Sequence, residues 1–163
     1  MKTLAAIAFG LTLLPVGAQN ITINLDRVAA KAKEKTEVTL GGPLLAQALK
    51  SLPEGIKASV NRVVIRKYEF EEEGQWSEAD IEAIRKQVGP GTGWSRVLTS
   101  KDDDEITEIY MLSQSGKPAG LLLISAEKKE LTVIHIGGSV DLASLHEVVN
   151  STIHYDLKSA GEQ

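Results

Sequence analysis

The chain has 163 residues, a formal net charge of −4 and no cysteine. It can form no disulfide and no cysteine-ligated metal site, so packing alone must hold the core. Acidic residues outnumber basic ones by 22 to 18, and only 4% of the residues are aromatic. We expect neither nucleic acid nor an anionic membrane as a partner, because both select basic surfaces.

The N-terminus has the three parts of a secretory signal peptide. These are a positive residue at Lys2, an apolar run over residues 4–14, and small residues that end at Ala18. The pattern predicts cleavage between Ala18 and Gln19 and an exported chain, periplasmic or secreted. The run is shorter than the roughly 20 apolar residues that cross a bilayer, and we expect no transmembrane segment in the mature chain. The alternative is a buried N-terminal helix.

The first part of the mature chain, residues 20–57, is predicted to be largely helical. Asn24 can cap a helix because apolar residues follow at positions 25, 28, 29 and 32, as on one helical face. Residues 36–40 alternate in polarity and predict a short strand. After Gly41-Gly42-Pro43, apolar residues between 44 and 52 indicate a second helix.

A long strand and the best-defined helix follow. Residues 58–71 are rich in β-branched and aromatic side chains, which favours a strand. Ser77 and Asp80 have the spacing of a capping box, and apolar residues at 81, 84 and 88 share one helical face. Gly89-Pro90 ends this helix.

Four strands are predicted over residues 94–101, 105–113, 117–126 and 130–137. Their short links require antiparallel neighbours. Asp141 can then cap a last helix, whose apolar stripe is Leu142, Leu145, Val148, Val149 and Ile153.

This element order predicts an α+β fold. The expected architecture is a two-layer sandwich in which amphipathic helices cover a mostly antiparallel sheet formed by the long strand and the four-strand meander. We assign residues 1–18 to the signal peptide, 19–157 to a single α+β domain and 158–163 to a polar tail.

Three segments invite a ligand-binding interpretation. The acidic clusters at 71–73 and 102–105 carry oxygen ligands for Ca²⁺ or Mg²⁺, but neither alternates ligands with spacers as a calcium loop does. Residues 89–93 are glycine-rich like a phosphate loop, yet they follow a helix and open a strand, the reverse of the required order. We predict solvated loops, no metal and no cofactor. Trp76 and Trp94 are expected to pack the helix ends onto the sheet.

The histidines are the remaining candidates for chemistry. His135 lies between Ile134 and Ile136 and therefore faces the opposite side of its strand. As a general base it needs a partner, and Ser125 and Glu127 on the neighbouring strand are candidates. Residues His146 and His154 form no His-x-x-x-His pair, so packing is a better interpretation than zinc. We assign no catalytic residue.

Several segments of the chain resemble one known family in order. They are Tyr68-Glu69-Phe70, Gly74 and Ser77-Glu78, then residues 93–96, then residues 130–134 with Gly137 and Asp141-Leu142. The chain resembles the domain of unknown function 4252, a family of exported bacterial proteins. The resemblance implies an exported α+β domain and, from neighbouring sigma-factor regulators, envelope signalling. It implies no catalytic residue.

The leading hypothesis is a non-catalytic interaction or regulatory module with a protein partner in the cell envelope. A carrier of a small molecule or lipid is the first alternative and requires a closed cavity of several hundred Å³. A hydrolase that uses His135 is the second, and it requires a carboxylate within hydrogen-bond distance of the imidazole.

Overall fold

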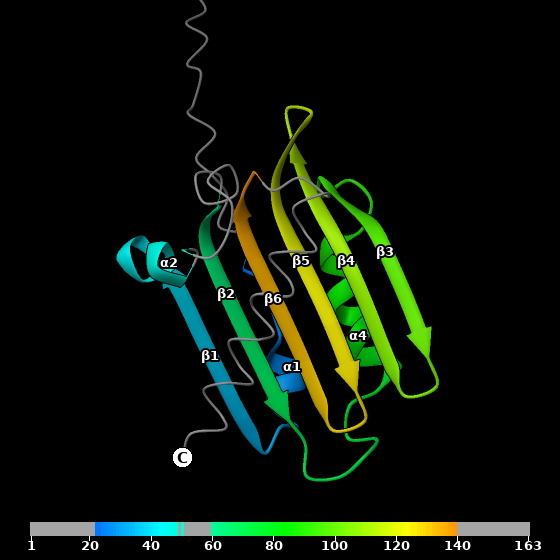
Figure 1. Ribbon diagram of the computed structural model, residues 1–163. Helices are drawn as coiled ribbons and strands as arrows, with labels where there is room; N and C mark the ends of the chain where they lie inside the picture. Colours follow the sequence, from blue (N-terminus) through cyan, green and yellow to red (C-terminus); the bar gives the residue numbers. More distant parts are fainter. Residues whose placement is uncertain (1–21, 49, 51–59, 140–163) are drawn as a thin grey trace, which may run out of the picture.

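The computed structural model describes residues 22–48, 50 and 60–139. These residues form a six-stranded antiparallel sheet in the order β1-β2-β6-β5-β4-β3 (Figure 1). The strands are β1 (Glu34–Gly41), β2 (Val60–Glu69), β3 (Trp94–Asp102), β4 (Glu105–Gln114), β5 (Lys117–Glu127) and β6 (Glu130–Gly138).

The predicted meander is confirmed. Strands β3 to β6 follow one another through tight hairpins, and each extends at most one residue beyond its predicted end. The long strand β2 pairs with β6, the last strand in sequence, and β1 pairs with the free side of β2. The chain therefore crosses from one side of the sheet to the other between β2 and β3 (Figure 1).

That crossing contains helix α4 (Glu78–Arg85) and the 3-10 turn η1 (Lys86–Val88). The predicted capping box is confirmed, since the backbone N–H of Ser77 donates to Asp80 Oδ2 at 2.8 Å and the Ser77 side chain accepts from the Asp80 backbone. Ile81 and Ile84 are at most 1% exposed. The amphipathic pattern therefore places this helix correctly, with its apolar stripe on the sheet.

Helix α1 (Asp26–Ala29) is shorter than its sequence pattern predicts. The cap predicted at Asn24 is wrong, because the N-cap is Leu25 and has no side-chain capping hydrogen bond. The Asn24 side-chain oxygen instead accepts the N–H of Asp26, the first helical residue, at 2.9 Å. The backbone N–H of Lys33 already donates to the carbonyl of Glu69 on β2 at 2.8 Å. Pairing with the sheet thus ends the helix early and lengthens β1 to eight residues.

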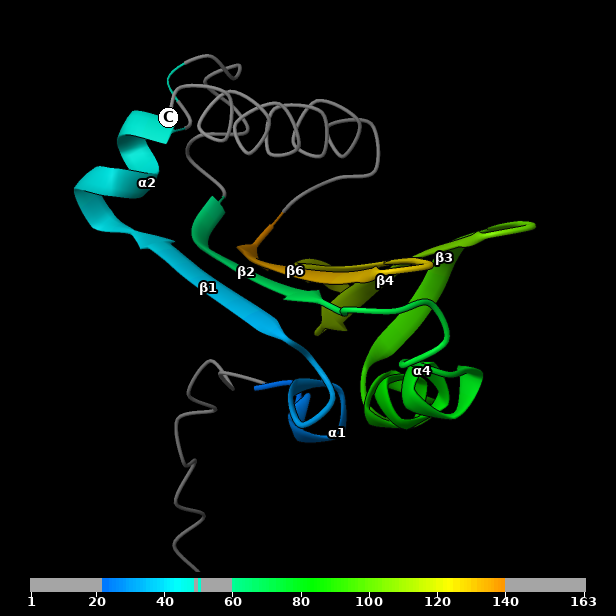
Figure 2. The same cartoon turned by 90° about the horizontal axis from the view of Figure 1, so that it is seen from below.

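Helices α1 and α4 lie against the same face of the sheet (Figure 2). The main core between them combines Val28 of α1 and Ile81 of α4 with sheet residues such as Tyr110 and Leu122. Both tryptophans contribute to this core, as expected: Trp94 is buried and Trp76 packs against the cluster.

A second cluster of buried apolar residues occupies the other face, and helix α2 (Gly42–Ala48) contributes Leu45 to it. The α+β content and the antiparallel sheet are therefore shown, with α1 and α4 on one face and α2 contributing to the other. Several predicted features lie outside the described residues. They are the cleavage site at Ala18 and Gln19, the final helix with His146 and His154, and the tail 158–163. None of the helices in the described part of the chain is long and apolar enough to span a bilayer.

Candidate functional site

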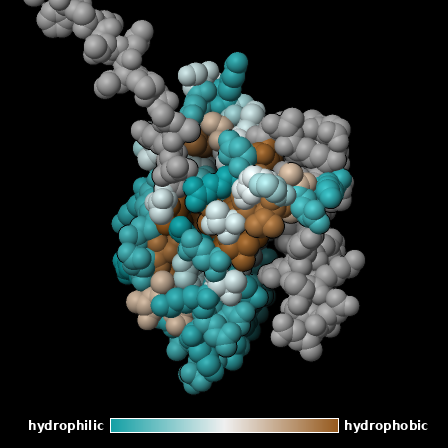
Figure 3. All heavy atoms as spheres, turned by 90° about the vertical axis from the view of Figure 1, so that its left-hand side faces the viewer, coloured by the Kyte–Doolittle hydropathy of each residue, from teal (hydrophilic) through white to brown (hydrophobic). Residues whose placement is uncertain are grey.

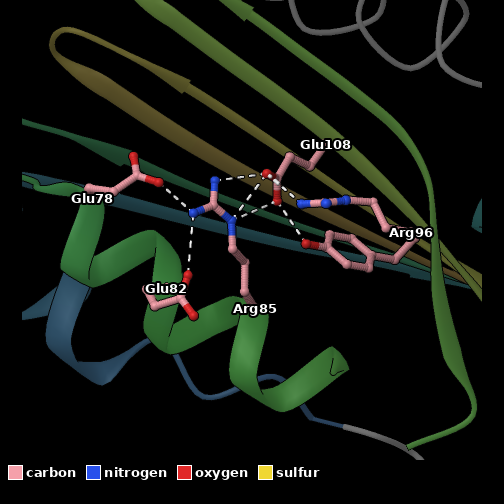
Figure 4. Close-up of polar contacts among 6 residues, drawn as sticks. Glu78, Glu82, Arg85, Arg96 and Glu108 are labelled. Atoms are coloured by element: carbon pink, nitrogen blue, oxygen red, sulfur yellow. Dashed lines mark hydrogen bonds and ion pairs between the residues drawn. The ribbon is translucent and has the colours of Figure 1, made fainter. Parts of the chain in front are cut away.

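A buried ion pair attaches α4 to the sheet. Glu108 of β4 is 1% exposed and accepts hydrogen bonds from Arg85 of α4, with Nη2 at 2.8 Å from Oε1 and Nε at 3.1 Å from both oxygens. The Tyr110 hydroxyl donates to the second carboxylate oxygen at 2.8 Å, and Arg96 Nη1 lies 3.6 Å from the first (Figure 4). Arg85 also contacts Glu78 and Glu82 on its own helix.

The protonation states in this cluster are strongly biased. Burial by itself raises the pKa of Glu108, but hydrogen bonds from Arg85 and Tyr110 and the charge of Arg96 outweigh it and hold the pKa below its ordinary value. Burial and the same carboxylate raise the pKa of Tyr110 to about 12. With its carboxylate saturated by donors, Glu108 has no free lone pair directed at a substrate, so the cluster is a structural element.

A second buried carboxylate connects α1 to α4. Asp80 is fully buried at the start of α4, and Lys31 Nζ lies 2.6 Å from its Oδ2. Arg27 lies 3.8 Å from its other oxygen, which receives no hydrogen bond. Burial would raise the pKa of Asp80, but the Lys31 and Ser77 hydrogen bonds prevail and lower it. Both helices are thus held by charge pairs as well as by apolar packing.

The sheet face opposite α1 and α4 changes in polarity along the strands, in rows of directly paired residues, and we call it the graded face. The row at the lower end of the sheet in Figure 1 is a carboxylate from every strand: Glu34, Glu69, Glu130, Glu127, Glu105 and Asp102. We call it the carboxylate row. The next row is hydroxyls and one lysine: Thr36, Lys67, Thr132, Ser125, Thr107 and Ser100.

The following two rows of this face are almost entirely apolar. One is Val38, Ile65, Ile134, Leu123, Ile109 and Leu98, and the other is Leu40, Val63, Ile136, Leu121 and Met111. Their central members are buried, whereas most of the carboxylate row is exposed. Seen from the β1 side, the lower end is hydrophilic and apolar residues gather above it (Figure 3).

Little positive charge balances the carboxylate row. Lys67 Nζ lies 3.1 Å from an oxygen of Glu69 and 3.1 Å from one of Glu130. Burial lowers the pKa of Lys67, but these two carboxylates outweigh burial and raise it. Within the described part of the chain, Lys67 is the one cation that pairs with this row. An open depression of about 620 Å³ adjoins the row, and its lining includes Glu105, Glu127 and Lys129.

The hydrolase hypothesis placed Ser125 and Glu127 beside His135, and the structure does not. Ser125 pairs with Thr132 on the graded face, whereas His135 pairs with Val64 and Leu122 on the helix-covered face. The expected orientation of His135 away from Ile134 and Ile136 is therefore correct, but the suggested partners are wrong. Among the described residues, the charged groups that act on His135 are two arginines.

The acidic clusters and the glycine-rich segment noted in the sequence lie in loops or turns. Residues 71–73 follow β2, and the turn 102–105 joins β3 to β4. Residues 89–93 connect η1 to β3, where Gly91 and Gly93 have positive φ angles of 83° and 84°. In the part of the chain that the structure describes, no three His, Asp or Glu side chains are grouped so that they could hold a metal ion.

The sequence indicated the carboxylate row only in part, and it gave little sign of the buried ion pair of Glu108. Acidic residues beside the hairpin turns were visible, but their alignment with Glu34 and Glu69 depends on long-range pairing. Glu108 was marked only by an acidic residue within an otherwise apolar alternation in β4.

Comparisons with known proteins agree with the segments noted above. A search among curated proteins gives no match. The family described as a domain of unknown function, DUF4252, matches residues 30–148, which is well over half of the chain. The match includes β1 to β6, α2 and α4. The chain therefore belongs to the domain of unknown function 4252 family.

Proposed function

We propose that this protein is a non-catalytic interaction module of the bacterial cell envelope, and that the carboxylate row with its neighbouring hydroxyl row is its binding surface. The proposed partner is a protein that binds this surface through a segment rich in Lys and Arg. One observation carries the proposal: each of six adjacent strands places a carboxylate at the same level of one face.

The arrangement opposes stability, which supports a role in binding. Like charges directly across neighbouring strands destabilise a sheet, typically by a few tenths of a kcal/mol to about 1 kcal/mol for each pair. Solubility needs net charge, but it does not need one sign of charge in register. A cationic partner would relieve this repulsion and gain charge-assisted hydrogen bonds.

The alternatives have less support. A carrier needs a large closed cavity, whereas apolar side chains fill the space between the sheet and α1 and α4. The hollow beside His135 measures only about 30 Å³. A hydrolase needs a base and its partner together, and the arginines near His135 cannot accept its proton.

The proposal includes export and the complete two-layer architecture. The leader over residues 1–18 supports export. The apolar stripe from Leu142 to Ile153 follows directly after β6 and matches the buried apolar rows in character. We propose that this segment is a helix that covers those rows and leaves the polar rows open.

The test compares two triple variants of equal charge change. Binding of a lysine- and arginine-rich decapeptide is measured by calorimetry for the mature protein, for E105Q/E127Q/E130Q, and for E71Q/E72Q/E73Q in the loop after β2. We expect the first variant to bind about tenfold more weakly, which corresponds to about 1.4 kcal/mol, and the loop variant to bind like the parent. Equal weakening in both variants would mean that net charge, not the row, attracts the peptide. That result would refute the proposed surface.

A further inference from the structure

The two outer strands of the sheet are its most exposed strands. Strand β1 pairs only with β2, and β3 only with β4, among the strands that the structure describes (Figure 1). Every residue of β1 except Leu40 is exposed, and so is every residue of β3 except Trp94. Three of the four large apolar side chains that remain exposed in the described part of the chain lie on these edges: Val38, Val97 and Leu98. Edge strands present unpaired N–H and C=O groups to which another strand can add.

The directions of the two edges are complementary. All neighbouring strands of the six-stranded sheet are antiparallel, so β3 runs opposite to β1. A second copy in the same orientation therefore offers its β1 to β3 of the first copy as the next antiparallel strand. Both faces of the sheet then continue across the contact.

The faces of the strands limit the possible registers. Leu98 pairs with Ile109 on the graded face, and by alternation Lys101 lies on the helix-covered face. On β1, Leu40 belongs to the graded face and Glu37 to the helix-covered face. Directly paired residues project to the same face, so the compatible registers differ from one another by two residues.

Two of these registers oppose like charges. If Leu98 lies opposite Val38 of the second copy, Lys101 lies opposite Lys35. A shift of two residues toward the start of β1 brings Lys101 opposite Lys33 instead. Like charges directly across two strands destabilise their pairing, so neither register is favoured.

The register shifted by two residues in the other direction opposes unlike charges. Lys101 then lies opposite Glu37 of the second copy. Asp103, in the turn after β3, reaches the level of Lys35. Neither lysine has an acidic partner among the described residues. Glu37 binds Arg66 through Oε2, but its side chain is 59% exposed and can accept a second donor.

The same register also matches apolar side chains. Leu98, which is 44% exposed, lies opposite Leu40 and is removed from water by the contact. The bulge between Arg96 and Leu98 interrupts the strand before this point, so the pairing extends from Leu98 to the turn. The resulting interface is small, and we expect weak association.

We propose that a second copy of this chain binds through its β1 to β3 of the first, antiparallel and with Leu98 opposite Leu40. The contact joins two different edges and leaves one edge of each copy free, so the copies associate head to tail rather than as a closed dimer. It includes none of Glu105, Glu127 and Glu130, and it can therefore fail without affecting the proposed function. Repetition of the carboxylate row along such an assembly would strengthen the binding of a long cationic partner.

Sedimentation velocity of the mature protein over a wide range of concentrations at low salt tests the contact. We expect the average mass to rise with concentration beyond that of a dimer, and added salt to reduce it, because the contact includes exposed charge pairs. K101E and E37K should each weaken the association about tenfold, because each turns an attractive pair into a repulsive one. K117E, which makes the same charge change at an exposed residue of β5, should have no effect.

Mixing the two variants distinguishes this pairing from its alternatives. In an equimolar mixture of K101E and E37K, every contact between unlike molecules pairs a lysine with a glutamate, so association should return. K35E and D103K repeat the design at residues that do not contact Arg66, and circular dichroism verifies that each variant is folded. Sensitivity to only one of K101E and E37K would mean that an edge pairs with itself. That result, a monomer at every concentration, equal weakening by K117E, or a mixture that stays dissociated would overturn the proposal.

Discussion

Replacing Glu108 by Gln tests how α4 is attached to the sheet. The substitution keeps the size of the side chain but removes the charge that faces Arg85, Tyr110 and Arg96. Breaking a buried ion pair costs about 3–5 kcal/mol. Arg85 keeps Glu78 and Glu82 as exposed partners and is itself 21% exposed, so the lower end of that range applies.

We therefore expect E108Q to lower the free energy of unfolding by about 3 kcal/mol. For a chain of this size, about 1 kcal/mol shifts the melting temperature by roughly 2–4 °C, so the expected decrease is about 6–12 °C. The assay is urea unfolding at pH 7, followed by tryptophan fluorescence, because Trp94 and Trp76 pack in the core beside α4.

The matched control is E82Q, which removes the charge of an exposed partner of the same arginine. It should change stability by less than about 0.5 kcal/mol. If E108Q and E82Q are alike, or if E108Q costs less than about 1 kcal/mol, the buried pair does not hold the helix. The reasoning from burial would then be refuted.

Two further predictions concern acid and the apolar rows. The lowered pKa values of Glu108 and Asp80 mean that their contribution to stability is complete above the ordinary carboxylate pKa of about 4 and is lost as pH falls through the folded values. Urea unfolding between pH 2 and 5 should therefore show a smaller loss in E108Q than in the parent, and equal slopes would contradict this. The variant L145D should destabilise the protein by about 2 kcal/mol if its segment covers the apolar rows, while S151D, off the stripe, should not. Similar stability of both variants would rule out the covering helix.

Local patterns predicted most of the sheet. Alternating polarity and short turns were sufficient to predict strands β3 to β6, and the spacing of Ser77 and Asp80 predicted the start of α4. These features depend on neighbours in sequence, which is why they are legible without coordinates.

Long-range pairing accounts for what the sequence could not predict. The early end of α1 depends on a hydrogen bond from Lys33 to β2. The group of Arg62, Arg66 and His135 depends on the pairing of β2 with β6, which are separated by five elements in the chain. Partners that are distant in sequence have no local signature, and a one-residue change in register would place His135 opposite a different side chain.

The rows of the graded face also have a consequence for folding accuracy. A slip of one residue between paired strands turns the apolar side chains of one strand from the core to the solvent. This cost specifies the register wherever one face of a sheet is buried. A slip of two residues keeps the same side chains on each face, so burial alone does not disfavour it. Here it would place an aliphatic side chain opposite a hydroxyl and a hydroxyl opposite a carboxylate. The gradient thus discriminates against the misaligned hairpins that simple alternation tolerates.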